Sequence, residues 1–250
     1  MSAFFAVIPA RYASTRLPGK PLAEIGGVPM VVRVWEQAMK AGLGDVVIAA
    51  GDQEIVDAAT AHGAKAVLTD ANLPSGSDRI WQAVQRLMAE GMARPDIIIN
   101  VQGDEPLMPP ELITQCLDAF AKNPDADVVT FGHIITNPAD LGDEAKVKIA
   151  IANLTDAGGR ALYFSRCSIP HGAAKMVRHI GFYGYTYDAL ERFVAAPPSP
   201  LEMQEKLEQL RGVEMGMHYH VCLTHHEPIG VDTPQDLERV RTLWNKAHGG

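Results

Sequence analysis

Residues 4–22 read FFAVIPARYASTRLPGKPL, and this stretch decides the fold class. It begins with a nearly unbroken apolar run over residues 4–9, which is typical of a strand that is buried on both faces. The loop that follows is too rich in charged and turn residues to lie in a core. In an open α/β sheet, ligands bind beyond the carboxyl ends of the strands, so we expect a binding site at this loop.

Strands and helices alternate through the rest of the first half of the chain. Apolar runs predict strands at residues 45–50, 65–69, 96–102 and 127–134. Helical spacing predicts a helix from Pro29 to Gly42, a second over residues 51–63, a third that Ser77 caps, and a fourth from Pro109. This alternation indicates right-handed βαβ units, and therefore an α/β fold with a mostly parallel, Rossmann-like sheet flanked by helices.

The second half of the chain has less helix between its strands. Strands are expected at residues 146–151, 161–164, 178–186 and 217–223. We therefore expect a small antiparallel extension at about 158–185, inserted in a single domain that spans residues 1–250. The stretch 161–185 is expected to expose apolar and aromatic residues, namely Tyr163, Phe164, Ile180 and Phe182.

Composition excludes several classes of protein. A net charge of −8 argues against non-specific nucleic-acid binding, which needs a broad basic face. The three cysteines show no CxxC spacing, which indicates free thiols in a reducing cytoplasm. The apolar run near the N-terminus is too short for a transmembrane span or a signal sequence. We expect a cytoplasmic protein without membrane insertion.

The loop at residues 10–21 concentrates positive charge in an acidic chain. Arg11, Arg16 and Lys20 lie within ten residues, and Gly19 lets the backbone approach a ligand closely. Fixed charges of this kind suit a triphosphate, although the same pattern also fits a solvated basic loop. The loop is no Walker A sequence, because Gly19-Lys20 is followed by Pro21. No GxGxxG follows the first strand either, which disfavours a dehydrogenase.

Two carboxylates lie where ligand-binding loops are expected. Asp104 directly follows the fourth strand, and Asp232 precedes the last helix with Thr233 as a plausible cap. The local pattern alone leaves both as ordinary turn or cap residues.

Several blocks, in order along nearly the whole chain, resemble one enzyme family. They are IPARYASTRLPGKPL (8–22), NVQGDEP (100–106), ALYFSR (161–166), RHIGFYGY (178–185), SPLE (199–202), KLEQLR (206–211) and GVDTPQDLERVR (230–241). The chain resembles the 3-deoxy-manno-octulosonate cytidylyltransferases, also called CMP-Kdo synthetases. The resemblance implies a nucleotidyltransferase sheet and a homodimer formed through the antiparallel extension.

The resemblance also implies roles for particular residues. The catalytic set is Arg11, Lys20, Asp104 and Asp232, of which the two aspartates hold Mg²⁺. The expected CTP-binding residues are Arg11, Ser14, Arg16, Lys20, Ser75, Gly76, Arg79 and Asp104, and those for the sugar acid are Gln102, Arg166, His179, Tyr183, Glu208 and Gln209. Arg79 is expected to brace the base-recognition loop or the phosphates, and Arg166 or His179 to pair with the sugar acid's carboxylate.

The implied reaction joins CMP from CTP to 3-deoxy-D-manno-octulosonate and releases pyrophosphate, feeding lipopolysaccharide or capsule synthesis. The anomeric hydroxyl attacks the α-phosphate in line, with no covalent enzyme intermediate. Two alternatives stay open: the same chemistry on another acceptor, such as an 8-amino analogue, another sugar acid or a phosphonate, or a non-catalytic nucleotide-binding protein. The chain departs from the family pattern at Ala50-Gly51, at Leu73, at Ala145 and in a shortened stretch at 170–178.

Overall fold

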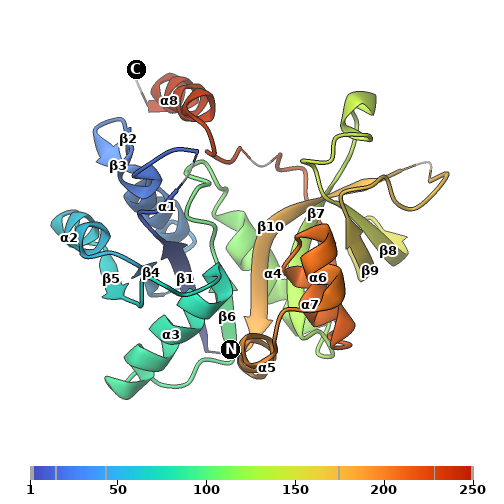
Figure 1. Ribbon diagram of the computed structural model, residues 1–250, viewed down its shortest axis with the longest axis horizontal. Coiled ribbons are helices and arrows are strands. Elements are labelled where there is room, and N and C mark those ends of the chain that lie inside the picture. Colours follow the sequence, from blue (N-terminus) through green and yellow to red (C-terminus); the bar gives the residue numbers. More distant parts are fainter. Residues whose placement is uncertain (1–2, 15, 43, 174, 228, 249–250) are drawn as a thin grey trace. The chain divides into compact units, whose positions relative to one another are not determined.

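A computed structural model describes residues 3–14, 16–42, 44–173, 175–227 and 229–248. The chain divides into two compact units, one formed by Met1–Thr114 with Pro228–Gly250 and the other by Gln115–Glu227 (Figure 1). Each unit has its own set of paired strands. The expected single domain over residues 1–250 stays a prediction.

The first unit contains the parallel sheet that the apolar runs predict. Its strands lie in the order β5 (Lys65–Leu68), β4 (Val46–Ala50), β1 (Phe4–Ala10) and β6 (Ile97–Asn100). All the neighbouring pairs among these four strands are parallel, with Val7 opposite Val47 on one side and Asn100 on the other. Every residue of β4 and β6 is buried, as expected of strands covered on both faces.

Three helices connect these strands, and their apolar spacing explains where they pack. In α1 (Met30–Met39) the buried residues include Met30, Val34 and Ala38, and in α2 (Gln53–Ala61) they are Ile55 and Ala59. The third helix, α3 (Gly76–Ala89), starts earlier than expected. Its N-cap is Ser75, whose hydroxyl accepts a hydrogen bond from the Asp78 amide, so the prediction that Ser77 caps this helix was wrong.

The order of the strands creates a crevice between β1 and β6. The chain runs from β1 to β4 and on to β5 in one direction, and then returns to β6 on the other side of β1. Because such crossovers are right-handed, α1 and α2 cover one face of the sheet and α3 covers the other (Figure 1). The carboxyl ends of β1 and β6 therefore flank the point where the direction reverses, which is where open α/β sheets bind their ligands.

The last helix, α8 (Pro234–His248), completes the core of the first unit. It packs against the small hairpin of β2 (Glu24–Ile25) and β3 (Val28–Pro29) through a buried cluster of Ile25, Met30, Val231, Leu237, Val240 and Trp244. Leu17 from the cation-rich loop also packs on this cluster. One core therefore holds both the loop after β1 and the segment that carries Asp232.

The second unit is built mainly from antiparallel strands. They lie in the order β10 (Val177–Thr186), β7 (Val128–Ile134), β11 (Tyr219–Leu223), β9 (Gly158–Ser165) and β8 (Lys148–Thr155). Among the described residues of these strands, β7 and β11 pair in parallel and the other neighbours pair antiparallel. The start of β10 also pairs with β8, so the hydrogen-bonded strands return to their starting strand. The antiparallel pairing expected at 158–185 is observed, and it includes β8 as well.

Four helices join these strands. The helix α4 (Glu111–Lys122) leads from the first unit into the second, and α5 (Tyr187–Ala195), α6 (Pro200–Glu205) and α7 (Gln209–Glu214) follow β10 along the chain. Short 3₁₀ turns occur at Lys20–Leu22 and Pro138–Asp140. None of the helices in the described part of the chain is long and apolar enough to span a bilayer.

The apolar residues of β9 and β10 are not the exposed surface that the sequence suggested. Phe164, Ile180 and Phe182 are at most 2% exposed and form part of the unit's own core. The prediction that they lie exposed was wrong, because alternate residues of these strands face inward. The exposed apolar side chains in this region are Leu162 on β9 and Leu154 on β8.

Candidate active site

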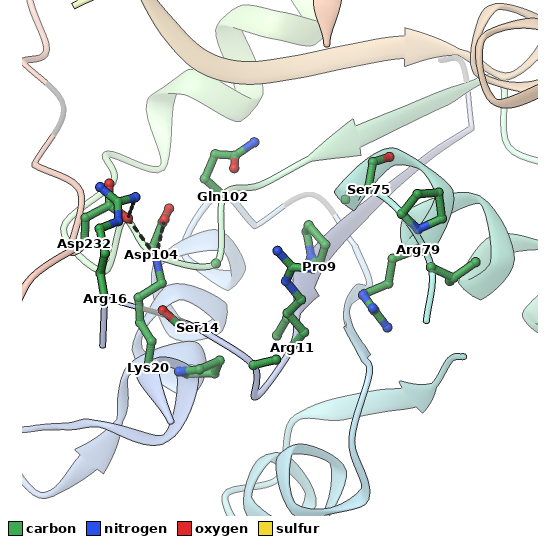
Figure 2. A pocket seen from close by; sticks show the side chains of 17 residues that line it. Pro9, Arg11, Ser14, Arg16, Lys20, Ser75, Arg79, Gln102, Asp104 and Asp232 are labelled. Atoms are coloured by element: carbon green, nitrogen blue, oxygen red, sulfur yellow. Dashed lines mark hydrogen bonds and ion pairs between the residues drawn. The ribbon is translucent and has the colours of Figure 1, made fainter. Parts of the chain in front are cut away.

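A cavity of about 710 Å³ opens at the carboxyl ends of β1 and β6, entirely within the first unit (Figure 2). Its lining residues come from the loop after β1, the loop before α3, the loop after β6 and the segment before α8. Those that the sequence analysis singled out are Arg11, Ser14, Arg16, Lys20, Leu73, Ser75, Gly76, Arg79, Gln102, Asp104 and Asp232. The structure thus brings together every residue expected to bind CTP.

An ion cluster lies on one side of this cavity. Lys20 Nζ lies 2.7 Å from Asp104 Oδ2 and 3.2 Å from Asp232 Oδ1, as the dashed lines in Figure 2 mark. Arg16 Nη2 lies 3.0 Å from the same oxygen of Asp232. The Lys20 side chain is only 17% exposed, whereas that of Arg16 is 65% exposed. Lys20 is therefore the shielded cation of the cluster, and its ammonium lies between the two carboxylates.

A close backbone approach places Asp104. A Cβ atom on the preceding Gly103 would lie 2.7 Å from the Pro9 carbonyl oxygen, so any larger residue would push the loop after β6 away from the end of β1. The Asp104 carbonyl in turn accepts a hydrogen bond of 2.9 Å from the Val231 amide. This bond joins the two segments that carry the carboxylates.

The start of α8 leaves the Asp232 carboxylate available. Thr233 Oγ1 accepts a hydrogen bond from the Asp236 amide, and Asp236 Oδ2 accepts hydrogen bonds from the amides of Asp232 and Thr233. The hydrogen bond from the Thr233 hydroxyl is the main cause that lowers the pKa of Asp236. Thr233 and Asp236 therefore satisfy the helix terminus, and the cap role that the local sequence left open for Asp232 falls to them.

The other side of the cavity carries Ser75 and Arg79 (Figure 2). The Arg79 side chain is buried and donates hydrogen bonds to Thr69 Oγ1 at 2.6 Å and to the Asp70 carbonyl at 3.0 Å. Burial is the main cause that lowers the pKa of Arg79, and the nearby Arg11 adds to it. Of the two roles expected for Arg79, these bonds support bracing of the loop before α3.

Ala50-Gly51, where the chain departs from the family pattern, lies against the buried Arg79 side chain. A Cβ atom on Gly51 would lie 2.7 Å from Arg79 Nη1, so the missing side chain makes room for the buried guanidinium. Leu73, the second departure, lines the cavity beside Ser75. Residue 174, within the shortened stretch 170–178, lies outside the described residues.

The residues expected to hold the sugar acid do not all lie in this cavity. Gln102 lines it, whereas Arg166, His179, Tyr183, Glu208 and Gln209 belong to the second unit. Within that unit the His179 ring contacts Tyr183 and Phe164 at centroid distances of 5.3 Å and 5.0 Å. Glu208 and Gln209 lie at the start of α7, which contacts β9.

The His179 ring is buried, and burial sets its charge state. Burial lowers the pKa of His179 to about 3, so the imidazole is neutral at pH 7. Its Nε2 lies 3.0 Å from Thr130 Oγ1, and that hydroxyl donates a hydrogen bond of 2.9 Å to the Phe182 carbonyl. A neutral His179 fits a hydrogen-bonding role, and its expected pairing with the sugar acid's carboxylate stays a prediction.

Arg166 remains the cation among these five residues. Its Nε donates to the Glu205 carbonyl at 3.0 Å and its Nη1 to the Glu144 carbonyl at 3.0 Å. Because these acceptors are carbonyl oxygens, the guanidinium is held in place without being neutralised by them.

The cavity residues that could bind a metal are two carboxylates. Among the described residues, no group of three or more His, Cys, Asp or Glu side chains is placed to hold a metal ion. Asp104 and Asp232 offer hard oxygen donors within reach of one cationic nitrogen. Such a pair suits a magnesium ion, which takes one or two carboxylates and completes its shell with water and phosphate oxygens.

Two contributors to the site were not found from the sequence. Thr69 and Asp236 support Arg79 and the Asp232 segment through side-chain hydrogen bonds. Asp236 was detectable, because it stands three residues after Thr233 and completes a cap pattern. Thr69 gave no signal, because it reads as the last residue of an ordinary strand.

Comparisons with known proteins find relatives along nearly the whole chain. The sequence profile of the cytidylyltransferase family matches residues 5–219. The 3-deoxy-manno-octulosonate cytidylyltransferase of Parvibaculum lavamentivorans is 52% identical over 236 residues, which cover 94% of this chain and 90% of the relative. That of Paramagnetospirillum magneticum is 50% identical over 239 residues, covering 95% and 96%.

A solved structure shares the whole fold. The structure of a CMP:2-keto-3-deoxy-manno-octonic acid synthetase in complex with CTP is 36% identical and superimposes with a TM-score of 0.89, covering 98% of this chain and 100% of the other. Fold, site and relatives together define a nucleotidyltransferase. The chain belongs to the cytidylyltransferase family.

We predict that Lys20→Ala and Arg11→Ala each lower kcat by about 10²–10³-fold, because each removes a preorganised charge from the cavity. The rate of pyrophosphate release from CTP measures the effect, and far-UV circular dichroism checks that the fold is intact. Lys65→Ala is the control, since Lys65 forms an exposed ion pair with Asp45 outside the cavity. Wild-type turnover in either site variant would show that the loop after β1 does not serve the triphosphate.

Proposed function

We propose that this enzyme transfers CMP from CTP to 3-deoxy-D-manno-octulosonate and releases pyrophosphate. The observation that carries the proposal is the cavity at the ends of β1 and β6, where Lys20 contacts Asp104 and Asp232 beside Arg11. Identities near 50% with 3-deoxy-manno-octulosonate cytidylyltransferases over nearly the whole chain support the acceptor.

The cavity's cations suit the handling of the triphosphate. Among the described residues, Arg11 forms no ion pair, and its side chain lines the cavity, so its charge is available to a phosphate group. Lys20 is positioned by two carboxylates, which fix its ammonium before substrate arrives. Both charges would offset the negative charge that develops on the departing pyrophosphate. Transfer to the attacking hydroxyl then needs positioning and charge neutralisation, without a nucleophile from the protein.

The base side of the site rests on the loop before α3. Because the Ser75 hydroxyl caps α3, the backbone groups of Ser75 and Gly76 are the parts of this loop that remain to meet a cytosine edge. Arg79 would act on the nucleotide indirectly, by fixing the backbone of residues 70–71.

Magnesium fits the carboxylate pair, and we propose Asp104 and Asp232 as its protein ligands. When bound there, the ion would supply a Lewis acid that lowers the pKa of the attacking hydroxyl and neutralises phosphate charge. Lys20 and Arg16 already contact these carboxylates, so they would hold the aspartates' orientation.

For the acceptor, we propose Gln102 among the cavity residues of the first unit, and we propose Arg166, His179, Tyr183, Glu208 and Gln209 as acceptor-binding residues of the second unit. Arg166 is the cation that suits the acceptor's carboxylate, while neutral His179 and Tyr183 suit its hydroxyl groups. A site that pairs with hydroxyl groups rejects acceptors that leave those groups unpaired, because an unpaired buried polar group is costly.

The alternatives are less well supported. A non-catalytic nucleotide-binding protein would have no need of Lys20 between two carboxylates. A nucleic-acid ligand disagrees with the net charge of −8. All three cysteines are free thiols, which supports a cytoplasmic location.

We predict that activity requires Mg²⁺ or Mn²⁺ and that Asp104→Asn and Asp232→Asn each abolish it. Asparagine keeps the side chain's shape but loses the charge that holds a hard cation. Binding of Mn²⁺ in the presence of CTP, measured by electron paramagnetic resonance, should weaken in both variants and remain unchanged in Asp118→Asn, which alters an exposed aspartate on α4. Full activity in excess chelator would contradict the proposed metal site.

We also predict a homodimer, which static light scattering at micromolar concentration would report as twice the chain mass of 27.0 kDa. Leu162, 53% exposed on β9, and Leu154, 39% exposed on β8, offer the apolar surface. Leu162→Glu should shift the mass toward the monomer, whereas Leu68→Glu on β5 of the first unit should not. A monomeric wild-type protein would refute the dimer.

The acceptor prediction is tested by kcat/KM. We expect 3-deoxy-D-manno-octulosonate to exceed its 8-amino analogue, a sialic acid and a small phosphonate by at least about tenfold, since unpaired buried groups penalise the analogues. We expect CTP to be strongly preferred over UTP. If another acceptor led by tenfold, the assignment to this sugar acid would fall while cytidylyl transfer would stand.

A further inference from the structure

Asp52 lies beside the triphosphate loop and makes an unusual contact. It is the N-cap residue of α2, a position where an aspartate side chain ordinarily accepts a hydrogen bond from its own helix. Here it makes no such bond. Its Oδ2 instead accepts a hydrogen bond of 2.7 Å from the backbone amide of Tyr12, which lies 40 residues earlier in the chain. The side chain at the N-cap position of α2 therefore contacts the loop after β1 and not its own helix.

A second bond joins the same two segments. The Gly51 amide donates to the Ala10 carbonyl at 2.8 Å, as the last link of the pairing between β1 and β4. Residues 10 and 12 are therefore both tied to residues 51 and 52. These two bonds lie on either side of Arg11 and fix the backbone from which its side chain enters the cavity.

Tyr12 extends this link to the other end of the loop. A Cβ atom on Gly19 would lie 3.3 Å from the Tyr12 hydroxyl oxygen and 3.4 Å from the ring carbon that carries it, so the end of the ring lies against Gly19. Gly19 has a φ of +68° and directly precedes Lys20. The Tyr12 side chain is 46% exposed, so the core does little to hold it. Its backbone bond to Asp52 is the polar contact that anchors it.

We propose that Asp52 is a positioning residue that holds the triphosphate loop in its binding geometry before CTP arrives. The proposal rests on the assignment of this cavity to CTP. Asp52 does not line the cavity, and it acts through the Tyr12 amide on Arg11 at one end of the loop and Lys20 at the other. Residues 11–18 form no helix or strand in the described part of the loop. The hydrogen bond from the Tyr12 amide to Asp52, which serves as a tether, therefore reduces the conformational entropy that the loop loses when substrate binds.

This role predicts a particular kinetic pattern. Without the tether, the loop must order itself when CTP binds, and the affinity for CTP falls. Once CTP is bound, its phosphates hold the same loop through Arg11 and Lys20, so the chemical step keeps most of its rate. We therefore expect KM for CTP to rise about tenfold, the scale of one hydrogen bond to a charged group, with kcat within about twofold and KM for the acceptor unchanged.

The decisive variant is Asp52→Ser. Serine remains a preferred N-cap residue, so α2 keeps its start, but its shorter side chain cannot reach the Tyr12 amide. Asp52→Asn keeps an acceptor oxygen at the same reach and should restore KM for CTP to within about threefold of the wild type. Glu54→Ala is the matched control, because Glu54 is an exposed acidic residue in the first turn of the same helix.

Hydrogen exchange of the free enzyme gives a readout that does not depend on turnover. We expect faster exchange over residues 11–19 in Asp52→Ser than in wild type, Asp52→Asn or Glu54→Ala, with protection restored by saturating CTP. Wild-type KM and wild-type exchange in Asp52→Ser would overturn the proposal. So would a loss of kcat with a lowered melting temperature shared by Asp52→Ser and Asp52→Asn, since that pattern marks a residue needed only for stability. If the wild-type enzyme failed to bind CTP, the proposed function would fail, whereas the exchange comparison would still test the tether.

Discussion

The contact of Lys20 with Asp104 and Asp232 holds three segments of the first unit together at the cavity. The lysine belongs to the loop after β1, Asp104 to the loop after β6, and Asp232 to the segment before α8. Two carboxylates that contact the same ammonium group repel each other, so a cation between them stabilises the pair. The lysine is that cation, and its position is fixed by the same interaction. Charge balance therefore determines the shape of the site before any substrate is present.

Neighbouring polar residues in this site have different roles, since some cap helices and others face the cavity. Asp236 and Thr233 satisfy the amides at the start of α8, which leaves the Asp232 carboxylate for Lys20 and Arg16. In the loop before α3, Ser75 takes the capping role and Arg79 supports the backbone. At α2 the arrangement differs, because the Asp52 side chain does not cap its own helix and instead accepts a hydrogen bond from the Tyr12 amide. At α8 and α3 one group satisfies the helix start so that another is free to face the cavity.

The sequence predicted what depends on local pattern and failed where long-range contacts decide. The parallel strands and α1 were predictable, because runs such as residues 46–50 are buried on both faces and Met30, Val34 and Ala38 share one side of a helix. Ser75 and Ser77 could not be told apart as caps, because the choice depends on the extended backbone at Ser75. The burial of Phe164 and Phe182 follows from strands that pair across the second unit. The contact between Tyr12 and Asp52 gave no signal, because nothing in either segment points to the other.

The core beneath α8 has a consequence for the order in which the molecule forms during synthesis. Val231, Leu237, Val240 and Trp244 complete a cluster begun by Ile25 and Met30, yet the whole of residues 115–227 is translated between these two groups. Since domains generally fold as they leave the ribosome, the second unit can become structured while the first still lacks its last helix. Asp232 can then reach Lys20 only after residues 115–227 have been translated. A nascent chain halted before residue 229 would expose the apolar surface of Ile25 and Met30, and would be a target for chaperones.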